Sequence, residues 1–269
     1  MNVFTARSDR RTLRTKNRPR LESLEGRQLM SLAGEFSATV NTTTRNAQFG
    51  SANASSTNGS SVVVWTDTFS ATDHDIRAQR YNAAGQKTGP EIIVSYSGLD
   101  EGSPTVAMDG GGNFVVSWVQ TLPGGDTNVV AQRFNSAGAA VGGVVQVGAG
   151  TFKEHNPSIA MDARGDFVVA YTRDTNYVGD NTPDVFAKLY NASNQLLNVI
   201  NVATTSSADD HASVAMTPDG RFNVAWEHTY STNDHDIYMN RYSAWGGLLG
   251  TSYVETSTAF ESRPSVSMD

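Results

Sequence analysis

The sequence contains no cysteine and no long run of apolar residues. Without cysteine it can form neither a disulfide nor a thiolate metal site, and it has no cysteine nucleophile. No stretch approaches the roughly 18 apolar residues of a transmembrane helix. Basic residues are scarce outside the N-terminal segment, since residues 31–269 carry 12 basic and 24 acidic side chains. This acidic body excludes the positively charged groove that binds nucleic-acid phosphates.

Small and polar residues fill much of the rest of the chain. Glycine occurs 24 times among 269 residues, and hydrophobic residues make up only 38%. Many short strands joined by turns have this composition, whereas long helices do not. We therefore expect an all-β protein with a single large domain or two small ones.

The N-terminal segment differs from the body in charge. Residues 1–30 carry eight basic and three acidic side chains. The basic part is not followed by the apolar stretch of about 7–15 residues that a secretory signal requires. We predict a disordered targeting or linker segment over residues 1–45 and a folded domain over 46–269.

One short motif in this segment resembles a known targeting sequence. "RLESLEGRQLMS", Arg20–Ser31, has two Leu-Glu pairs, an arginine and a Leu-Met-Ser end. It resembles the LEPR-XLL motif at the N-terminus of large surface or secreted proteins of planctomycete bacteria, with Gly26 before Arg27 and Met30 in place of a leucine as departures. The resemblance implies an extracellular or cell-envelope location and implies no activity.

The body repeats one pattern four times. Each copy has an aromatic residue at the end of a predicted strand and a glycine six residues earlier. The aromatic residues are Trp65, Trp118, Tyr171 and Trp226, and the glycines are Gly59, Gly112, Gly165 and Gly220. A glycine in a tight turn supplies the positive φ that a side chain disfavours. Internal repetition at a spacing of about 53 residues predicts a repeat architecture.

A second turn signal follows each aromatic strand. The residues at this position are Gly85, Gly138, Asn194 and Gly246, and asparagine tolerates the left-handed conformation best after glycine. Each unit thus predicts four antiparallel strands, the size of a β-propeller blade. The predicted repeats are about 48–103, 104–156, 157–211 and 212–263, with a partial unit at 264–269.

The second strand of each unit indicates how the units pack. In the second repeat Phe114, Val116 and Trp118 share one face, while Val115 and Ser117 share the other. Both faces are uncharged, whereas a sheet with one solvated face alternates apolar with polar residues. We therefore predict a β-propeller-like array in which large side chains of one sheet fill space left by small ones of the next. A stacked β-sandwich array would have more polar outer faces.

Two interpretations of the last residues remain open. The strand "RPSVSMD", Arg263–Asp269, completes the first blade and closes a four-bladed ring, or it begins a fifth unit of a longer propeller. We favour the second, because Asp269 matches Asp109 and Asp162 just before the turn glycine. Residues 48–269 also resemble uncharacterised repeat stretches of large bacterial extracellular proteins, through Val-Ala, Asp-Gly, Phe-Val-Val-x-Trp, Ala-Gln-Arg-Phe and Asn-x-x-Gly. This resemblance identifies the repeating unit, and it implies no activity.

Acidic loops between the second and third strands offer metal ligands. They contain "TDHDI" and "NDHDI", and the weak candidates for a metal site are Asp73, Asp75, Asp234 and Asp236. Calcium prefers such oxygen ligands, which makes a calcium-dependent adhesive module one interpretation. The D-x-D-x-D-G loop is missing. The alignment of Asp75, Asn128, Asp184 and Asp236 by repeat favours a structural role.

Other candidate residues also follow the repeat. Arg80, Arg133 and Arg241 align, which predicts ion pairs or stacking rather than a ligand site. His155 and His211 are predicted at equivalent places in two loops. The one departure is "WEHTY", where Glu227 is a candidate general acid.

The sequence as a whole thus favours a non-enzymatic, secreted or cell-surface module that binds or scaffolds, with a glycan or an envelope protein as its partner. No catalytic or cofactor-binding residues are assigned. The alternative is a propeller-type glycoside hydrolase or lyase, and a hydrolase requires two carboxylates about 5–9.5 Å apart.

Overall fold

The structure is a computed structural model, and it describes residues 40, 47–174 and 182–268. All of the described residues belong to one compact unit. The predicted targeting motif, Arg20–Ser31, therefore lies outside the described residues. In the described part, no helix is long and apolar enough to span a membrane.

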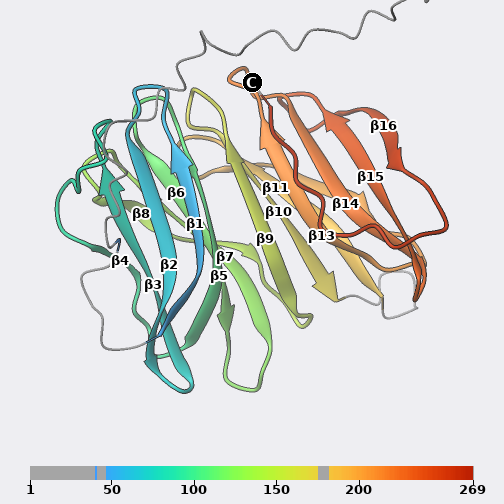
Figure 1. Cartoon of the computed structure of the whole chain (residues 1–269), viewed down its shortest axis with the longest axis horizontal. Helices are drawn as coiled ribbons and strands as arrows, with labels where there is room; N and C mark the ends of the chain where they lie inside the picture. Colours follow the sequence, from blue (N-terminus) through green and yellow to red (C-terminus); the bar gives the residue numbers. More distant parts are fainter. Residues whose placement is uncertain (1–39, 41–46, 175–181, 269) are drawn as a thin grey trace, which may run out of the picture. The chain divides into compact units, whose positions relative to one another are not determined.

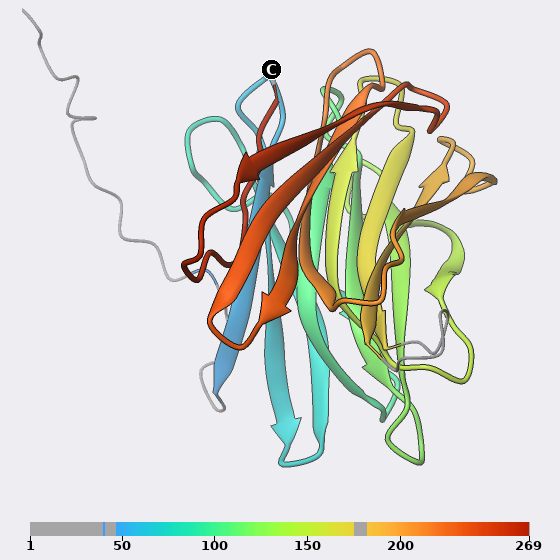
Figure 2. The same ribbon diagram turned by 90° about the vertical axis from the view of Figure 1, so that its right-hand side faces the viewer.

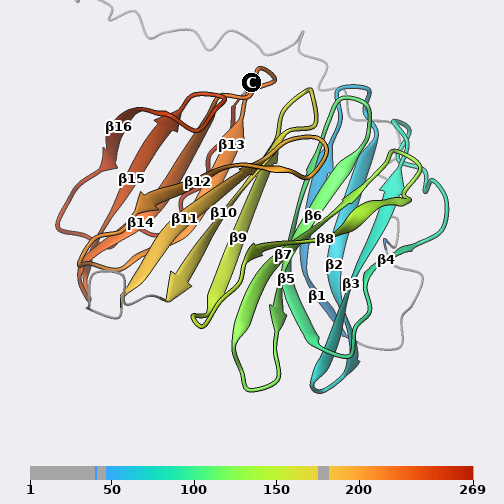
Figure 3. The same cartoon turned by 180° about the vertical axis from the view of Figure 1, so that it is seen from behind.

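The described residues form sixteen β-strands, arranged in four antiparallel sheets of four strands each (Figures 1 and 3). The first sheet contains β1 (Gln48–Ser55), β2 (Ser61–Ser70), β3 (Asp73–Tyr81) and β4 (Ile92–Ser95). The second contains β5 (Asp100–Met108), β6 (Phe114–Thr121), β7 (Thr127–Phe134) and β8 (Ala140–Gly148). The third contains β9 (Glu154–Met161), β10 (Phe167–Asp174), β11 (Pro183–Tyr190) and β12 (Leu196–Ala203). The fourth contains β13 (Asp209–Met216), β14 (Phe222–Ser231), β15 (Asp234–Tyr242) and β16 (Leu248–Glu255).

Within each sheet the strands follow chain order, and the first strands β1, β5, β9 and β13 lie beside one another (Figure 2). This confirms the predicted all-β, propeller-like array with one sheet per repeat.

The sheets pack face to face in the predicted manner. Phe114, Val116 and Trp118 of the second sheet lie in one buried cluster with Val62 and Val64 of the first. The second and third sheets, and the third and fourth, form equivalent clusters. Large side chains on one sheet therefore fill the space above small side chains on its neighbour, and this close packing holds adjacent sheets together.

Both predicted turn positions adopt left-handed backbone conformations. The φ angle is +84° at Gly112, +85° at Gly138 and +62° at Asn194. Asparagine therefore replaces glycine where the backbone needs a residue that tolerates this region. The two turn signals were correctly assigned.

Gly85→Ala tests the turn geometry without a steric clash. The φ angle of Gly85 is +73°, and nothing lies within 4 Å of an added Cβ atom. We expect the free energy of unfolding to fall by about 1–2 kcal/mol, because only the backbone conformation disfavours alanine. Gly143→Ala is the matched control, since it also has open space but no positive φ. Urea denaturation that shows equal stability for both variants would contradict this.

The first strand of each sheet contains a bulge at its N-terminal end. The register shifts at the bulge residues, and a residue there is left-handed in each strand: Gly50, Ser103, Asn156 and His211, with φ between +50° and +59°. These strands begin before the predicted "SVAM" segment, and the extra residues carry the site described below.

Residues 263–268 continue this arrangement beside the fourth sheet. Arg263 has a φ of +53°, like the bulge residues. The Val266 amide donates to Ser213 Oγ at 3.2 Å, just as the Val214 amide donates to Ser158 Oγ at 3.1 Å. The segment thus runs along β13 as β13 runs along β9, while the first sheet has β1 as its own first strand.

Candidate functional site

The left-handed residues surround a cavity where the first strands begin. Its volume is about 540 Å³, and all five repeat-equivalent positions line it: Gly50, Ser103, Asn156, His211 and Arg263. The backbone repeats around this cavity, but the side chains differ at every position. A bulge re-aims side chains and is frequent beside active sites. The backbone around the cavity is therefore regular, whereas the side chains that line it do not repeat.

His211 lies between two carboxylates at this cavity. Its Nδ1 atom is 3.5 Å from Glu227 Oε2 and 3.6 Å from Asp210 Oδ2. That nitrogen is buried and makes no hydrogen bond within the described residues, whereas the side chain as a whole is 36% exposed. His211 thus connects the buried Glu227 and the half-buried Asp210 to the open cavity.

Asp210 is held in its ionised form. Its Oδ1 atom accepts hydrogen bonds from Thr172 Oγ1 at 2.6 Å, Asn156 Nδ2 at 3.0 Å and the His211 amide at 2.6 Å. Burial alone raises the pKa of Asp210, but these hydrogen bonds lower it below the ordinary value for aspartate. A carboxylate kept negative in this way can act as a base or a nucleophile.

Glu227 occupies a more enclosed position on β14, where it is 6% exposed. Its Oε1 atom lies 2.6 Å from His235 Nδ1, and its Oε2 atom accepts a 3.3 Å hydrogen bond from the Arg263 amide. The equivalent residue of the third sheet is Thr172, which is also buried. Glu227 is therefore a true departure from the repeat, as its sequence context indicated.

The two carboxylates are close enough to act on one bond. The sum of their distances to His211 Nδ1, 7.1 Å, is the largest separation that Glu227 Oε2 and Asp210 Oδ2 can have. Retaining glycosidases place their carboxyl groups about 5–5.5 Å apart, and inverting enzymes about 6.5–9.5 Å apart. The 7.1 Å limit allows both the retaining separation and the lower end of the inverting range.

A further buried pair supports the end of β14. Asp209 Oδ1 lies 2.6 Å from His228 Nδ1 and accepts a 2.9 Å hydrogen bond from Trp226 Nε1. The His228 ring stacks on Tyr238, with ring centroids 5.0 Å apart. This network fixes the strand segment that carries Glu227.

The structure corrects the predicted equivalence of His155 and His211. His155 pairs with Thr172, and Asp210 pairs with Glu227, so His155 corresponds to Asp210. His211 corresponds instead to Asn156, the other left-handed residue. The two histidines differ by one residue in register, since His155 lies three residues before Ser158 and His211 lies two residues before Ser213. His211 is therefore unique to its repeat.

The weak metal candidates lie in two pairs on third strands. Asp73 and Asp75 belong to β3, and Asp234 and Asp236 belong to β15. Asp75 is fully buried, and Arg77 Nη2 lies 4.0 Å from its Oδ2 atom. Within the described ranges, no group of three or more acidic or histidine side chains has the arrangement of a metal site. A calcium site at these residues stays a prediction.

Asp75→Asn is expected to stabilise the protein at neutral pH. Burial, followed by the charges of Asp73 and Glu101, raises the pKa of Asp75 from 3.8 to about 6, while Arg77 opposes the shift. A raised acid pKa destabilises the fold above about pH 6 and has no effect below about pH 4. The gain in unfolding free energy should be about 1–3 kcal/mol at pH 7.

The gain from Asp75→Asn should disappear as the pH falls to 4, which chemical denaturation at several pH values can measure. Asp174→Asn is the control, because that side chain is 52% exposed. A pH-independent effect would show that charge burial is not its cause.

No family model and no curated protein matches this chain. Solved structures do resemble its fold. An α-L-arabinanase of Penicillium chrysogenum in complex with arabinobiose has a TM-score of 0.57 at 12% identity, over 80% of this chain and 68% of its own. An α-L-arabinofuranosidase of Fusarium graminearum with arabinobiose has a TM-score of 0.52 at 10% identity, over 75% of this chain and 65% of its own. A polysaccharide lyase, an ulvan lyase bound to -[GlcA(1-4)Rha3S]-, has a TM-score of 0.52 at 10% identity, over 76% of this chain and 54% of its own.

These likenesses establish the fold class, and they contradict the preferred prediction of a non-enzymatic binding or scaffold module. That prediction assumed that no singular polar cluster interrupts the repeat. The cluster exists, because His211, Asp210 and Glu227 occupy repeated backbone positions with side chains that the other repeats lack.

Proposed function

We propose that the protein is a polysaccharide-cleaving enzyme of the glycoside hydrolase type, with Glu227 and Asp210 as its carboxylate pair. The placement of both carboxylates beside His211, which itself lines the cavity, carries this proposal. The fold likeness to an arabinanase and an arabinofuranosidase supports it further.

The environments of the two acids suggest different roles. Asp210 accepts three hydrogen bonds and stays ionised, so it would attack the anomeric carbon or activate a water molecule. Glu227 is the more enclosed acid and would protonate the leaving glycosidic oxygen. Water then adds across the broken C–O bond, and each product chain carries a hydroxyl. Two titratable groups in contrasting surroundings are the usual basis for dividing acid and base roles.

A lyase is the second candidate, and the exposure of His211 favours it. His211 lines the cavity with Arg263, whereas the two carboxylates lie behind it. In a lyase, His211 would remove the proton next to the carboxylate of a uronic acid, and Arg263 would bind that carboxylate. The C4–O bond then breaks, its oxygen leaves as a hydroxyl after taking a proton from water, and a C4–C5 double bond remains. The fold likeness to an ulvan lyase supports this candidate.

Product analysis on neutral arabinan and on a uronic-acid polysaccharide tests the proposal. A hydrolase forms new reducing ends without unsaturated sugars, whereas a lyase forms unsaturated uronates that absorb ultraviolet light. We expect hydrolysis that depends on Glu227 and Asp210. Unsaturated products that disappear in His211→Ala would favour the lyase instead. Binding of either polymer without any cleavage by concentrated protein would contradict both candidates.

The proposed substrate agrees with the location implied by the N-terminal resemblance. Polysaccharides lie outside the cell or in its envelope, so we propose the same place for this protein. Glycans are accordingly its proposed partners. Cell fractionation with an antibody against the folded domain tests this location, and recovery in the cytoplasm alone would contradict it.

A further inference from the structure

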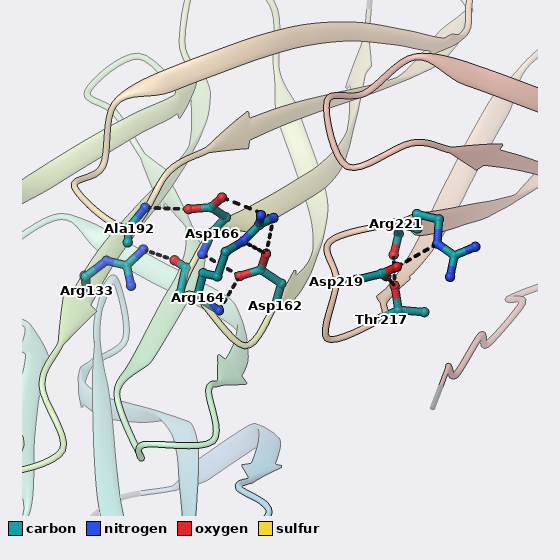
Figure 4. A network of polar contacts seen from close by, with 9 residues as sticks. Arg133, Asp162, Arg164, Asp166, Ala192, Thr217, Asp219 and Arg221 are labelled. Carbon is teal, nitrogen blue, oxygen red and sulfur yellow. Dashed lines mark hydrogen bonds and ion pairs between the residues drawn. The ribbon is translucent and has the colours of Figure 1, made fainter.

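At two of the three junctions between sheets, an arginine at the same repeat position donates to a turn of the following sheet. Arg80 of the first sheet donates from Nη1 to the Ser136 carbonyl of the second. Arg133 of the second sheet donates from Nη2 to the Gly165 carbonyl of the third, at 2.7 Å (Figure 4). Its Nε also donates to Asn194 Oδ1, at 2.9 Å. Each arginine therefore binds the tight turns of the following sheet.

The Arg133 contact also includes stacking. Its guanidinium carbon lies 5.2 Å from the ring centroid of Phe167, a large residue of the following sheet. At the third junction Leu189 replaces the arginine, and Asn198 Nδ2 instead donates to the Trp245 carbonyl at 2.9 Å. The predicted stacking is thus confirmed for Arg133, whose hydrogen bonds go to the Gly165 carbonyl and to Asn194 Oδ1.

The fourth sheet presents the same contact surface without a sheet on it. Arg241 is exposed, and its side chain makes no hydrogen bond or ion pair with any part of the chain that the structure describes. Val254, on the same side of this sheet, is 56% exposed. Its equivalents Val147 and Val202 are 0% and 7% exposed. At the other junctions the next sheet buries these valines, whereas no described sheet covers Val254.

The segment 264–268 adds a second element to this surface. It runs along β13 through the Val266–Ser213 hydrogen bond, and no described strand pairs with it. An extended segment with unpaired backbone groups is a template for an added strand. A docking unit would therefore find both an apolar face and a strand edge at one place.

We infer that this face is a docking surface for three further antiparallel strands of the same repeat, with residues 264–268 as the first strand of the completed sheet. The docked unit places its large-residue face on Val254 and Met239, and its tight turns against Arg241. The three existing junctions establish this mode of packing. The inference does not depend on the proposed enzymatic function.

A second copy of the chain does not offer a suitable face. The one large-residue face that no preceding sheet covers belongs to the first sheet, as far as the structure describes the chain. There Trp65 is only 4% exposed, and the Val40 carbonyl contacts the Tyr81 hydroxyl. The occupant that fits is therefore a new unit of this repeat.

Extending the full chain tests the inference. Asp269 corresponds to Asp162, so a copy of residues 163–203 joined after Asp269 supplies three further strands in the register of the repeat. We expect the melting temperature to rise by about 5 °C or more. Hydrogen exchange should also slow in residues 264–268 and at Val254. An unchanged melting temperature and unchanged exchange would overturn the inference.

Two variants separate docking from a nonspecific effect. In the extended chain, serine at the copied positions of Phe167, Val169 and Tyr171 should abolish the rise in melting temperature. Arg241→Ala should reduce the rise in the extended chain and leave the chain of 269 residues unchanged. Equal effects of Arg241→Ala in both chains would count against the proposed contact.

Two further outcomes would also overturn the inference. A copy of residues 110–148 from the second repeat is the alternative extension, and failure of both extensions to dock would exclude a sheet of this repeat. A concentration-dependent dimer of the chain of 269 residues, lost in Val254→Asp, would identify a second copy as the occupant.

Discussion

Glu227→Gln is expected to reduce polysaccharide cleavage by about 10²–10⁴-fold, the usual contribution of a general acid. The amide keeps the shape of the side chain and can still contact His235 and the Arg263 amide. It cannot supply a proton to the leaving oxygen. Initial rates on the polysaccharide that the wild-type protein cleaves measure the effect, together with the melting temperature of each variant.

Glu255→Gln is the matched control for this substitution. Glu255 lies on the same sheet but is exposed and does not line the cavity. Its rate should equal that of the wild-type protein. If Glu227→Gln keeps full activity while the fold is intact, Glu227 is not the acid, and the roles assigned to the pair fail.

Trp118→Ala is expected to lower the free energy of unfolding by about 3–5 kcal/mol. The side chain is 1% exposed and packs between the second sheet and Val62 and Val64 of the first. Its Nε1 atom has no hydrogen-bond partner in the described part of the chain, so packing alone accounts for the loss. Denaturant unfolding at constant pH measures the change.

Trp245→Ala provides the comparison for Trp118. Trp245 is 68% exposed, and only its backbone carbonyl takes part in a junction. Its replacement should change stability by no more than about 0.5 kcal/mol. Equal losses for the two tryptophans would contradict burial of each sheet between its neighbours.

The sheets and their packing could be predicted because two simple rules act along the whole repeat. Side chains alternate between faces of a strand, which separates Phe114 and Trp118 from Val115 and Ser117. Turn positions with positive φ accept glycine or asparagine, which marks Gly112 and Asn194. Both rules concern the position of a residue within one strand or one turn, so they can be applied to a single sequence.

The site could not be predicted in the same way because it depends on the bulges. A bulge adds one residue to a strand, so alternation counted from the "SVAM" segment fails beyond it. The equivalence of His211 and His155 is a separate error of one residue, because His211 and Asn156 each lie two residues before the aligned Ser213 and Ser158. The sequence does mark the left-handed position, because a proline follows each of Ser103, Asn156 and Arg263. Alignment on that position places His211 with the left-handed residues and isolates it as unique.

No comparable sequence pattern predicts the contact between His211 and Glu227. The two residues lie on different strands, and only the register of β13 against β14 brings them together. The Arg263 amide reaches Glu227 from a third segment. Sequence reasoning could select Glu227 as a departure from the repeat, but it could not identify its neighbours.

The crystal structure of the Glu227→Gln variant with a bound oligosaccharide is the most direct measurement of the proposed active site. We predict a sugar in the cavity lined by His211 and Arg263, with a glycosidic oxygen within hydrogen-bond distance of the side chain at position 227 and the anomeric carbon facing Asp210. An oligosaccharide bound only elsewhere on the surface, with this cavity free of sugar, would contradict the assignment.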